Sequence, residues 1–83
     1  MLVTDRIETN PKVMMGKPVV RGTRITVELI LRKISEGASE EELLDAYPRL
    51  TIKDIKAAIR YAADTLAHEE VVILYSPKRS ARK

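Results

Sequence analysis

Three cations at helical spacing are the first residues whose types and positions could do chemistry. Lys53, Lys56 and Arg60 stand at positions i, i+3 and i+7, which lie on one face of a helix. Such a row can contact phosphates or the edges of bases. The alternative is an ordinary solvated helix face, because Asp54 and Asp64 dilute the row. The spacing indicates a candidate DNA-contacting face with this plain alternative beside it.

A second cationic feature lies in residues 16–25, which read Gly-Lys-Pro-Val-Val-Arg-Gly-Thr-Arg-Ile. Two glycines and a proline restrict the backbone path, so we expect Arg21 and Arg24 to be held close together. A guanidinium pair suits phosphates or carboxylates, and both residues join the candidate DNA contacts. In the alternative, they pair with an acidic helix and simply fix the loop. The segment lacks the spacing of a phosphate-binding P-loop, so nucleotide binding is not expected.

No combination of residues predicts catalysis or metal binding. His68 is the one histidine, and with Glu69 and Glu70 it does not form the paired histidines of a helical zinc site. A solvated helix end is the expected setting for these three residues. The serines have only His68 as a base, and nothing places them together. The chain has no cysteine. We therefore expect no enzyme, no metal and no cofactor.

The first predicted helix covers residues 27–36, and it sits between two local signals. Thr26 is a suitable N-cap, and Gly37 suits the left-handed position that follows many helices.

Two further predicted helices follow at short spacing. The second covers residues 40–47, where Ser39 and Glu42 form a capping box and Pro48 ends the helix. The third begins after Thr51, another N-cap. Its predicted core stripe consists of Ile52, Ile55, Ile59, Ala62 and Leu66. This order is helix-turn-helix spacing, in which the last helix enters the major groove of DNA.

The two ends of the chain differ from this helical middle. A small β-hairpin is predicted around the turn at residues 16–18, pairing residues 13–14 with residues 19–20. Residues 71–75 predict a short strand, with a helical extension as the alternative, before a basic tail. The expected fold is mainly α: a three-helix, homeodomain-like helix-turn-helix domain at 26–70, with a short N-terminal β-hairpin arm at 1–25 and a strand and tail at 71–83.

Charge and length limit the partners. The chain has 83 residues and a net charge of +3, so it makes one domain with a thin core that a homodimer would help to complete. Residues 27–75 are acidic overall, whereas both ends are basic, so a polyanion would meet the ends first. We find no signal peptide and no membrane span in the sequence, and the expected location is the cytoplasm.

The motifs together resemble a known family. They are Asn10-Pro11, the run from Gly16 to Ile25, Gly37-Ala38-Ser39-Glu40-Glu41-Glu42-Leu43-Leu44, Tyr47-Pro48-Arg49-Leu50-Thr51, Asp54-Ile55-Lys56-Ala57-Ala58 and Tyr61-Ala62-Ala63-Asp64. Over about residues 5–68 the chain resembles the small prokaryotic family called domain of unknown function 433. The family is similar to homeodomain-like helix-turn-helix proteins, and many members resemble VapB-type antitoxins of toxin–antitoxin pairs. It offers no catalytic residues to carry over.

The resemblance implies an antitoxin that binds operator DNA and inhibits a PIN-like ribonuclease toxin. We expect an apolar segment and a basic tail to contact the toxin, because an added strand could dock it and arginines could enter a metal-binding acidic pocket. The expected toxin contacts are Val71, Ile73, Tyr75, Arg79 and Arg82. The alternative function is a protein-interaction module or structural homodimer that does not bind DNA.

Overall fold

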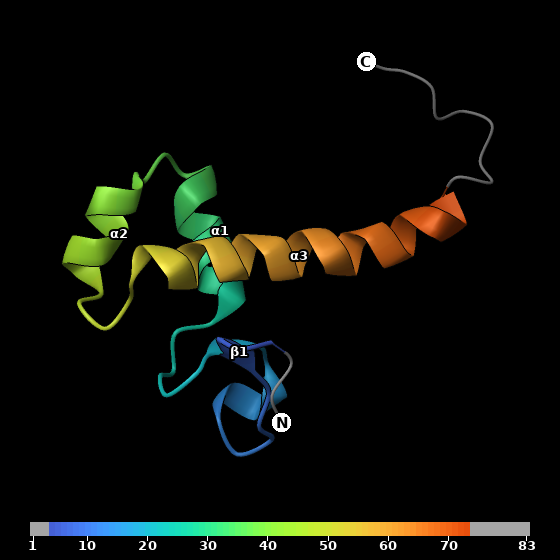
Figure 1. Cartoon of the computed structure of the whole chain (residues 1–83), viewed down its shortest axis with the longest axis horizontal. Coiled ribbons are helices and arrows are strands. Elements are labelled where there is room, and N and C mark those ends of the chain that lie inside the picture. Colours follow the sequence, from blue (N-terminus) through green and yellow to red (C-terminus); the bar gives the residue numbers. More distant parts are fainter. Residues whose placement is uncertain (1–3, 74–83) are drawn as a thin grey trace.

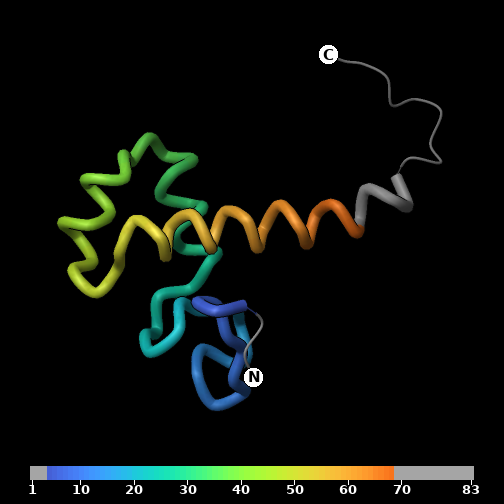
Figure 2. Tube along the Cα trace, in the orientation of Figure 1, coloured from blue at the N-terminus to red at the C-terminus, as the bar shows by residue number. Residues whose placement is uncertain are grey.

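The computed structural model describes residues 4–73, with side chains for residues 4–68, and shows three helices and a two-stranded sheet (Figure 1). Helix α1 spans Val27–Ser35, α2 spans Glu40–Ala46 and α3 spans Ile52–Ile73. Strands β1 (Ile7–Glu8) and β2 (Val19–Val20) form the sheet. The sheet lies on one side of α3, and α2 lies at the N-terminal end of α3 (Figure 1), while the C-terminal part of α3 runs on past the other helices (Figure 2). The predicted mainly α, three-helix fold with an N-terminal β arm is confirmed.

The predicted helix caps are present. Thr26 Oγ1 accepts a hydrogen bond from Leu29 N, and Ser39 forms the predicted capping box with Glu42. Gly37, at φ +102°, follows α1, and its N–H donates to the carbonyl of Ile34. Helices α1 and α2 each end one residue earlier than predicted. The three helices therefore follow one another in the predicted order, and α1 and α2 begin where predicted.

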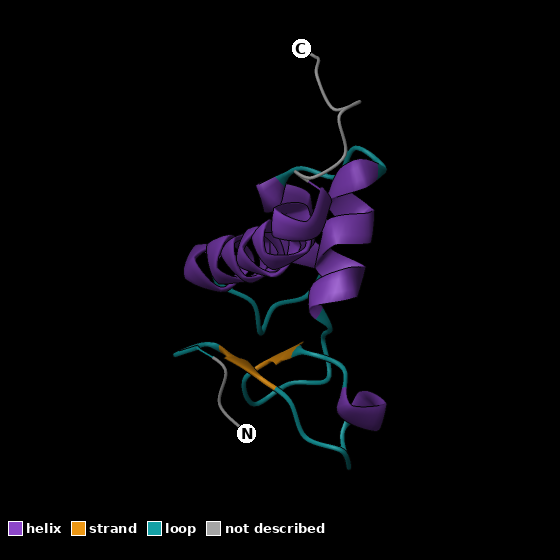
Figure 3. Ribbon diagram, turned by 90° about the vertical axis from the view of Figure 1, so that its right-hand side faces the viewer, coloured by secondary structure: helices purple, strands orange, loops and turns teal. Residues whose placement is uncertain are grey.

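The strand pairing differs from the prediction. Ile7 pairs with Val20 and Glu8 with Val19, in antiparallel register, below the helices in Figure 3. The predicted partner of β2, residues 13–14, instead enters a single 3-10 turn at Met14–Gly16. Burial explains the choice, because Ile7 is fully buried whereas Met14 is 40% exposed. Pairing with β1 instead places the fully buried Ile7 beside Val20, which is also buried in the core.

One hydrophobic core joins the sheet to the helices. Its buried members are Ile7, Val20, Val27, Ile30, Leu43, Leu50, Ile55 and Ala58. The predicted stripe on α3 is only partly correct, because Ile55 is buried but Ile52, Ile59 and Leu66 are 46%, 42% and 56% exposed. The buried line of α3 follows Asp54, Ile55 and Ala58, which face the other elements.

The strand predicted at residues 71–75 is wrong where the structure describes it. Helix α3 continues to Ile73, so residues 71–73 are helical, as in the alternative interpretation. Extending a helix fixes one residue for each added hydrogen bond, and the Ala-rich stretch before residue 71 favours this extension. The candidate toxin contacts Val71 and Ile73 lie where only the backbone is described, and Tyr75, Arg79 and Arg82 lie beyond the described residues. Within residues 4–73, no helix is both long enough and apolar enough to span a bilayer.

Candidate nucleic-acid interface

The first turn of α3 is fixed by a second capping box, which the sequence interpretation missed. Thr51 Oγ1 accepts a hydrogen bond of 3.2 Å from Asp54 N, and Asp54 Oδ2 accepts one of 3.0 Å from Thr51 N. These bonds satisfy N–H groups that a helix start leaves without a partner. Lys53 and Lys56 follow on the exposed side of the same segment. The first turn of α3, which carries these two cations, is therefore held in place by its cap.

Asp54 also binds the N-terminal arm. Arg6 Nη1 donates a 3.0 Å hydrogen bond to Asp54 Oδ1, and the residue Asp54 is only 6% exposed. A buried carboxylate needs such partners, because desolvation disfavours an unpaired charge. The sequence interpretation assumed that Asp54 dilutes the exposed cationic row. Because Asp54 is buried, it does not do so. It faces inward and attaches the arm beside α3.

The predicted cationic row lines a hollow between the arm and α3. Its volume is about 580 Å³, and its lining consists of Thr4, Asp5, Arg6, Lys53, Lys56, Ala57, Arg60 and Asp64. Four of these residues are basic and two are acidic, a net charge of +2. Arg60 Nε lies 3.9 Å from Asp64 Oδ2, and both side chains are largely exposed, so this pair neutralises little. Lys53, Lys56 and Arg60 thus come together as predicted, and Arg6 joins them. We call this surface the basic hollow.

Arg21 and Arg24 do not share one surface. Arg21 lines a neighbouring hollow with Asp5, Arg6 and Asp54, next to the basic hollow. Arg24 lines a separate hollow with Glu8 and Arg49 among others. Among residues 4–68, neither arginine forms an ion pair, so the alternative that both pair with the acidic α2 is wrong. Of the two, only Arg21 shares a hollow with residues that also line the basic hollow, Asp5 and Arg6.

The loop that carries both arginines is held by the backbone and by the helix-turn-helix turn. Gly22 has φ +79°, a conformation that side chains disfavour. Arg49, in the turn between α2 and α3, donates a 2.9 Å hydrogen bond from Nη2 to the Gly22 carbonyl. Thr23 accepts from Ile25 N and donates to the Val20 carbonyl. The loop and the start of α3 are therefore linked through Arg49, a contact that no sequence signal indicated.

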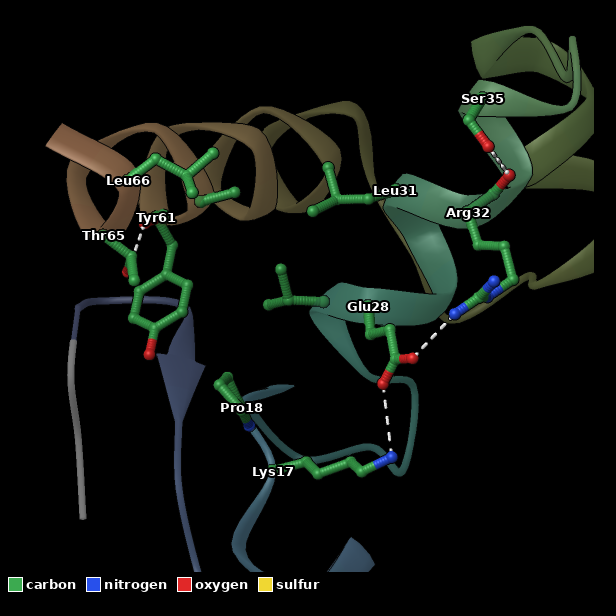
Figure 4. A pocket seen from close by; sticks show the side chains of 11 residues that line it. Lys17, Pro18, Glu28, Leu31, Arg32, Ser35, Tyr61, Thr65 and Leu66 are labelled. Atoms are coloured by element: carbon green, nitrogen blue, oxygen red, sulfur yellow. Dashed lines mark hydrogen bonds and ion pairs between the residues drawn. The ribbon is translucent and has the colours of Figure 1, made fainter. Parts of the chain in front are cut away.

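A second surface feature is a groove between α1 and the C-terminal half of α3 (Figure 4). Its volume is about 590 Å³, and its lining consists of Lys17, Pro18, Val27, Glu28, Leu31, Arg32, Ser35, Tyr61, Ala62, Thr65 and Leu66. Its walls are mainly apolar, and its charges gather at one rim. We call it the apolar groove.

Charged groups pair at the rim of the apolar groove. Glu28 accepts hydrogen bonds from Arg32 Nη2 at 2.9 Å and from Lys17 Nζ at 3.2 Å (Figure 4). The hydrogen bond from Arg32, and then that from Lys17, hold the pKa of the Glu28 carboxyl below its usual range. The rim therefore carries a carboxylate at neutral pH, with a cation on each side.

The structure shows no cluster of groups suited to metal binding in the part it describes. Among the described side chains, no three His, Asp or Glu residues lie close enough together to hold a metal ion. His68 is exposed, as expected, but it does not lie at a helix end, because α3 continues to Ile73.

Comparison with known proteins gives the family. Residues 7–62 match the family described as "Protein of unknown function (DUF433)". The chain is 38% identical over 56 residues, 68% of its length, to the uncharacterized protein y4eO of Sinorhizobium fredii, and it spans 25% of that protein's length. The crystal structure of a DUF433 member protein from Anabaena variabilis aligns with a TM-score of 0.72 at 32% identity, covering 86% of this chain and 70% of that one. The family resemblance in the sequence is confirmed, and the chain belongs to the DUF433 family.

Proposed function

We propose that this protein is a DNA-binding antitoxin, which contacts double-stranded DNA through α3 and inhibits a PIN-like ribonuclease. The basic hollow carries the DNA half of the proposal, because Arg6 joins Lys53, Lys56 and Arg60 on one surface. α3 is the second helix of the helix-turn-helix, the helix that enters the major groove in DNA-binding proteins of this type. Both proposed partners would place the protein in the cytoplasm.

The acidic α2 helps to define how DNA would approach. Its exposed carboxylates, Glu40, Glu41, Glu42 and Asp45, would repel phosphates. The basic hollow lies between the arm and α3, whereas α2 lies at the N-terminal end of α3, away from the sheet (Figure 1). We therefore propose that the duplex approaches α3 from the arm side, where Arg6 and Arg21 add phosphate contacts. Arg24, which lines a different hollow, falls outside this contact set.

A salt series with matched variants tests the DNA half. The probe is a fluorescent duplex of about two helical turns, carrying the sequence upstream of the gene, because two half-sites one turn apart would then fit. Each lost phosphate contact flattens the slope of log affinity against log salt by about one unit. The Lys53→Ala/Lys56→Ala variant should lose about two units, and adding Arg60→Ala should remove about a third one.

The control removes two cations from elsewhere. Lys12 and Lys33 do not line the basic hollow, so the Lys12→Ala/Lys33→Ala variant should retain the wild-type slope. If the α3 variants kept the wild-type affinity and slope, α3 would not be the DNA-contacting helix, and the interaction-module alternative would be preferred. Equal losses in both pairs would indicate a diffuse charge effect and would also contradict the proposed site.

The antitoxin half depends on the C-terminal residues and on the family resemblance. Val71, Ile73 and Tyr75 are the proposed apolar anchors, and Arg79 and Arg82 are the proposed contacts with the toxin's acidic pocket. The test is co-expression of the neighbouring reading frame, with and without this protein. Growth arrest by the neighbour alone, relieved by this chain, is the expected result. A harmless neighbour with no nuclease activity would contradict the proposal.

A further inference from the structure

We infer that α3 recognises thymine in the major groove, with Ile52 and Ile59 in contact with the methyl groups of the bases. The inference rests on the proposed contact between α3 and DNA, and it starts from the exposed side chains at the beginning of that helix. Over residues 52–59, about two turns, the exposed side chains are those of Ile52, Lys53, Lys56 and Ile59. In a helix-turn-helix, the N-terminal residues of the second helix are the ones that reach the edges of bases.

Both isoleucines lie outside the hydrophobic core. Ile52 is 46% exposed and Ile59 is 42% exposed. Neither is a member of the core, and neither is among the partly buried residues that pack against it. Neither lines the basic hollow or the apolar groove. Among residues 4–68, whose side chains the structure describes, these two apolar side chains therefore remain accessible to a partner.

The neighbouring lysines favour DNA over a protein as that partner. Because successive residues of a helix turn by about 100°, Lys56 lies about 40° around the helix from Ile52, and Ile59 lies about 20° to the other side. The isoleucines are therefore flanked by cations. Lysine is depleted in interfaces between proteins, whereas interfaces with DNA are strongly positive. With Lys53 and Lys56 on phosphates, the isoleucines are left to face the bases.

The exposed face of residues 52–59 offers no side-chain hydrogen-bond acceptor to a base. Adenine and cytosine each present an amino group in the major groove, and an amide or a carboxylate side chain usually accepts from it. The chain has no glutamine, and its single asparagine, Asn10, lies in the arm, where its Oδ1 accepts the N–H of Lys12. Asp54 is buried and bound by Arg6. An aliphatic side chain can still recognise one feature of the four bases, the C5-methyl group of thymine.

The spacing of Ile52 and Ile59 allows two such contacts. Seven residues of helix rise by about 10 Å, and stacked base pairs are about 3.4 Å apart. A helix lying along the groove would therefore place the two side chains about three base pairs apart. The loss of one buried methyl group should weaken binding by about fourfold, and the loss of two by about fifteenfold.

Replacement of every thymidine by deoxyuridine in the duplex tests the inference, because it removes the methyl groups and keeps the phosphates and the base pairing. With the fluorescent duplex of the salt series, wild type should bind the deoxyuridine form about fourfold to fifteenfold more weakly. Ile52→Ala/Ile59→Ala should bind the thymidine duplex more weakly than wild type does, and it should bind both duplexes with similar affinity. Its salt slope should stay that of wild type, because no phosphate contact is lost.

Leu66→Ala is the matched control for the isoleucine variant. Leu66 is 56% exposed on the same helix but lies beyond its first two turns, so this variant should keep the wild-type ratio of the two affinities. Equal affinity of wild type for the two duplexes overturns the inference, and this measurement does not depend on the folding of a variant. A wild-type ratio in Ile52→Ala/Ile59→Ala overturns it as well, because other residues would then contact the methyl groups. So does an equal loss of the ratio in Leu66→Ala, because the effect would not be particular to the isoleucines.

The salt slopes of the lysine variants separate failure of this inference from failure of the proposed function. A chain whose slope depends on Lys53 and Lys56, but whose affinity ignores the methyl groups, binds DNA without recognising thymine. That result overturns the inference and leaves the proposed DNA contact in place. A chain that binds neither duplex overturns both.

Discussion

The guanidinium of Arg6 lies 3.0 Å from the carboxylate of Asp54, a residue 48 positions later in the chain. The other oxygen of the same carboxylate accepts the N–H of Thr51, which begins the third helix. One buried side chain therefore fixes both the N-terminal arm and the start of α3. Because the basic hollow lies between these two elements, its shape depends on Asp54.

Removal of the Asp54 side chain should therefore reduce stability and DNA binding together. Asp54→Ala loses the cap and leaves Arg6 without its partner, which should lower the free energy of unfolding by about 2–3 kcal/mol. Asp54→Asn keeps a capping oxygen and should lose less. Asp64→Ala is the control, because its pair with Arg60 is exposed and is worth less than about 0.5 kcal/mol. Urea denaturation measures all three, and equal losses for Asp54→Ala and Asp64→Ala would contradict the role given to Asp54.

Substitution of Gly22 should destabilise the protein because of the backbone conformation at this position. No atom lies within 4 Å of an added Cβ, so the cost comes from φ +79° and not from a clash. Gly22→Val should therefore destabilise the protein by about 1–2 kcal/mol. Gly22→Asn should lose less, since asparagine adopts this conformation more readily. Thermal melting compares the two. Unchanged stability of Gly22→Val, with lost DNA or partner binding, would show that the loop is a contact surface and not a strained support.

Local signals in the sequence predicted the helical part of the fold. The capping box at Ser39 and Glu42 lies within four consecutive residues, and the residue types alone indicate it. Gly37 likewise marks the end of α1 through its own backbone freedom. The cationic row on α3 was predictable for the same reason, because helical spacing brings Lys53, Lys56 and Arg60 to one face whatever the rest of the chain does.

Long-range contacts were not predictable in this way. β2 could pair with residues 13–14 or with β1, and burial of Ile7 in the shared core decides between them. Leu66 is 56% exposed because of how the other elements pack on α3, and the pattern of α3 alone does not contain this information. The contact between Arg6 and Asp54 is equally distant in sequence. The spacing of Thr51 and Asp54 is a local signal for the helix cap. It does not indicate that Arg6 of the N-terminal arm binds Asp54.

At acid pH, the interactions of Glu28 with Arg32 and Lys17 at the rim of the apolar groove should no longer stabilise the folded protein. The Glu28 pKa is lowered, mainly by its hydrogen bond to Arg32 and then by Lys17, so the ionised carboxylate is favoured in the folded protein. Its stabilisation is fully present above the unfolded pKa and is lost as pH falls through the folded one. Wild type should therefore be more stable than Glu28→Gln at neutral pH, and the two should converge in acid. Urea denaturation over a pH series measures the difference, and a gap that persists below the folded pKa would contradict this explanation.

Deletion of residues 76–83 separates two roles for the C-terminal tail. The deletion removes Lys78, Arg79, Arg82 and Lys83. If the tail inhibits a nuclease, the truncated chain should lose inhibition of the co-encoded enzyme while its oligomeric state stays unchanged. Its salt slope on the duplex should also stay near that of wild type, because the proposed phosphate contacts lie on the arm and α3. Replacing the four basic residues with glutamine keeps the chain length, and it should reproduce the loss if the charges carry the effect.

The opposite results would give the tail a different role. Full inhibition by the truncated chain would remove the tail from the inhibitory mechanism. A slope that flattens by up to about four units, with inhibition intact, would show that the tail contacts phosphates instead. Inhibition lost on truncation but retained in the glutamine variant would show that the length of the tail matters and its charge does not. That last result would contradict the view that arginines enter an acidic pocket, because glutamine cannot supply the paired, charged hydrogen bonds that a carboxylate draws from a guanidinium.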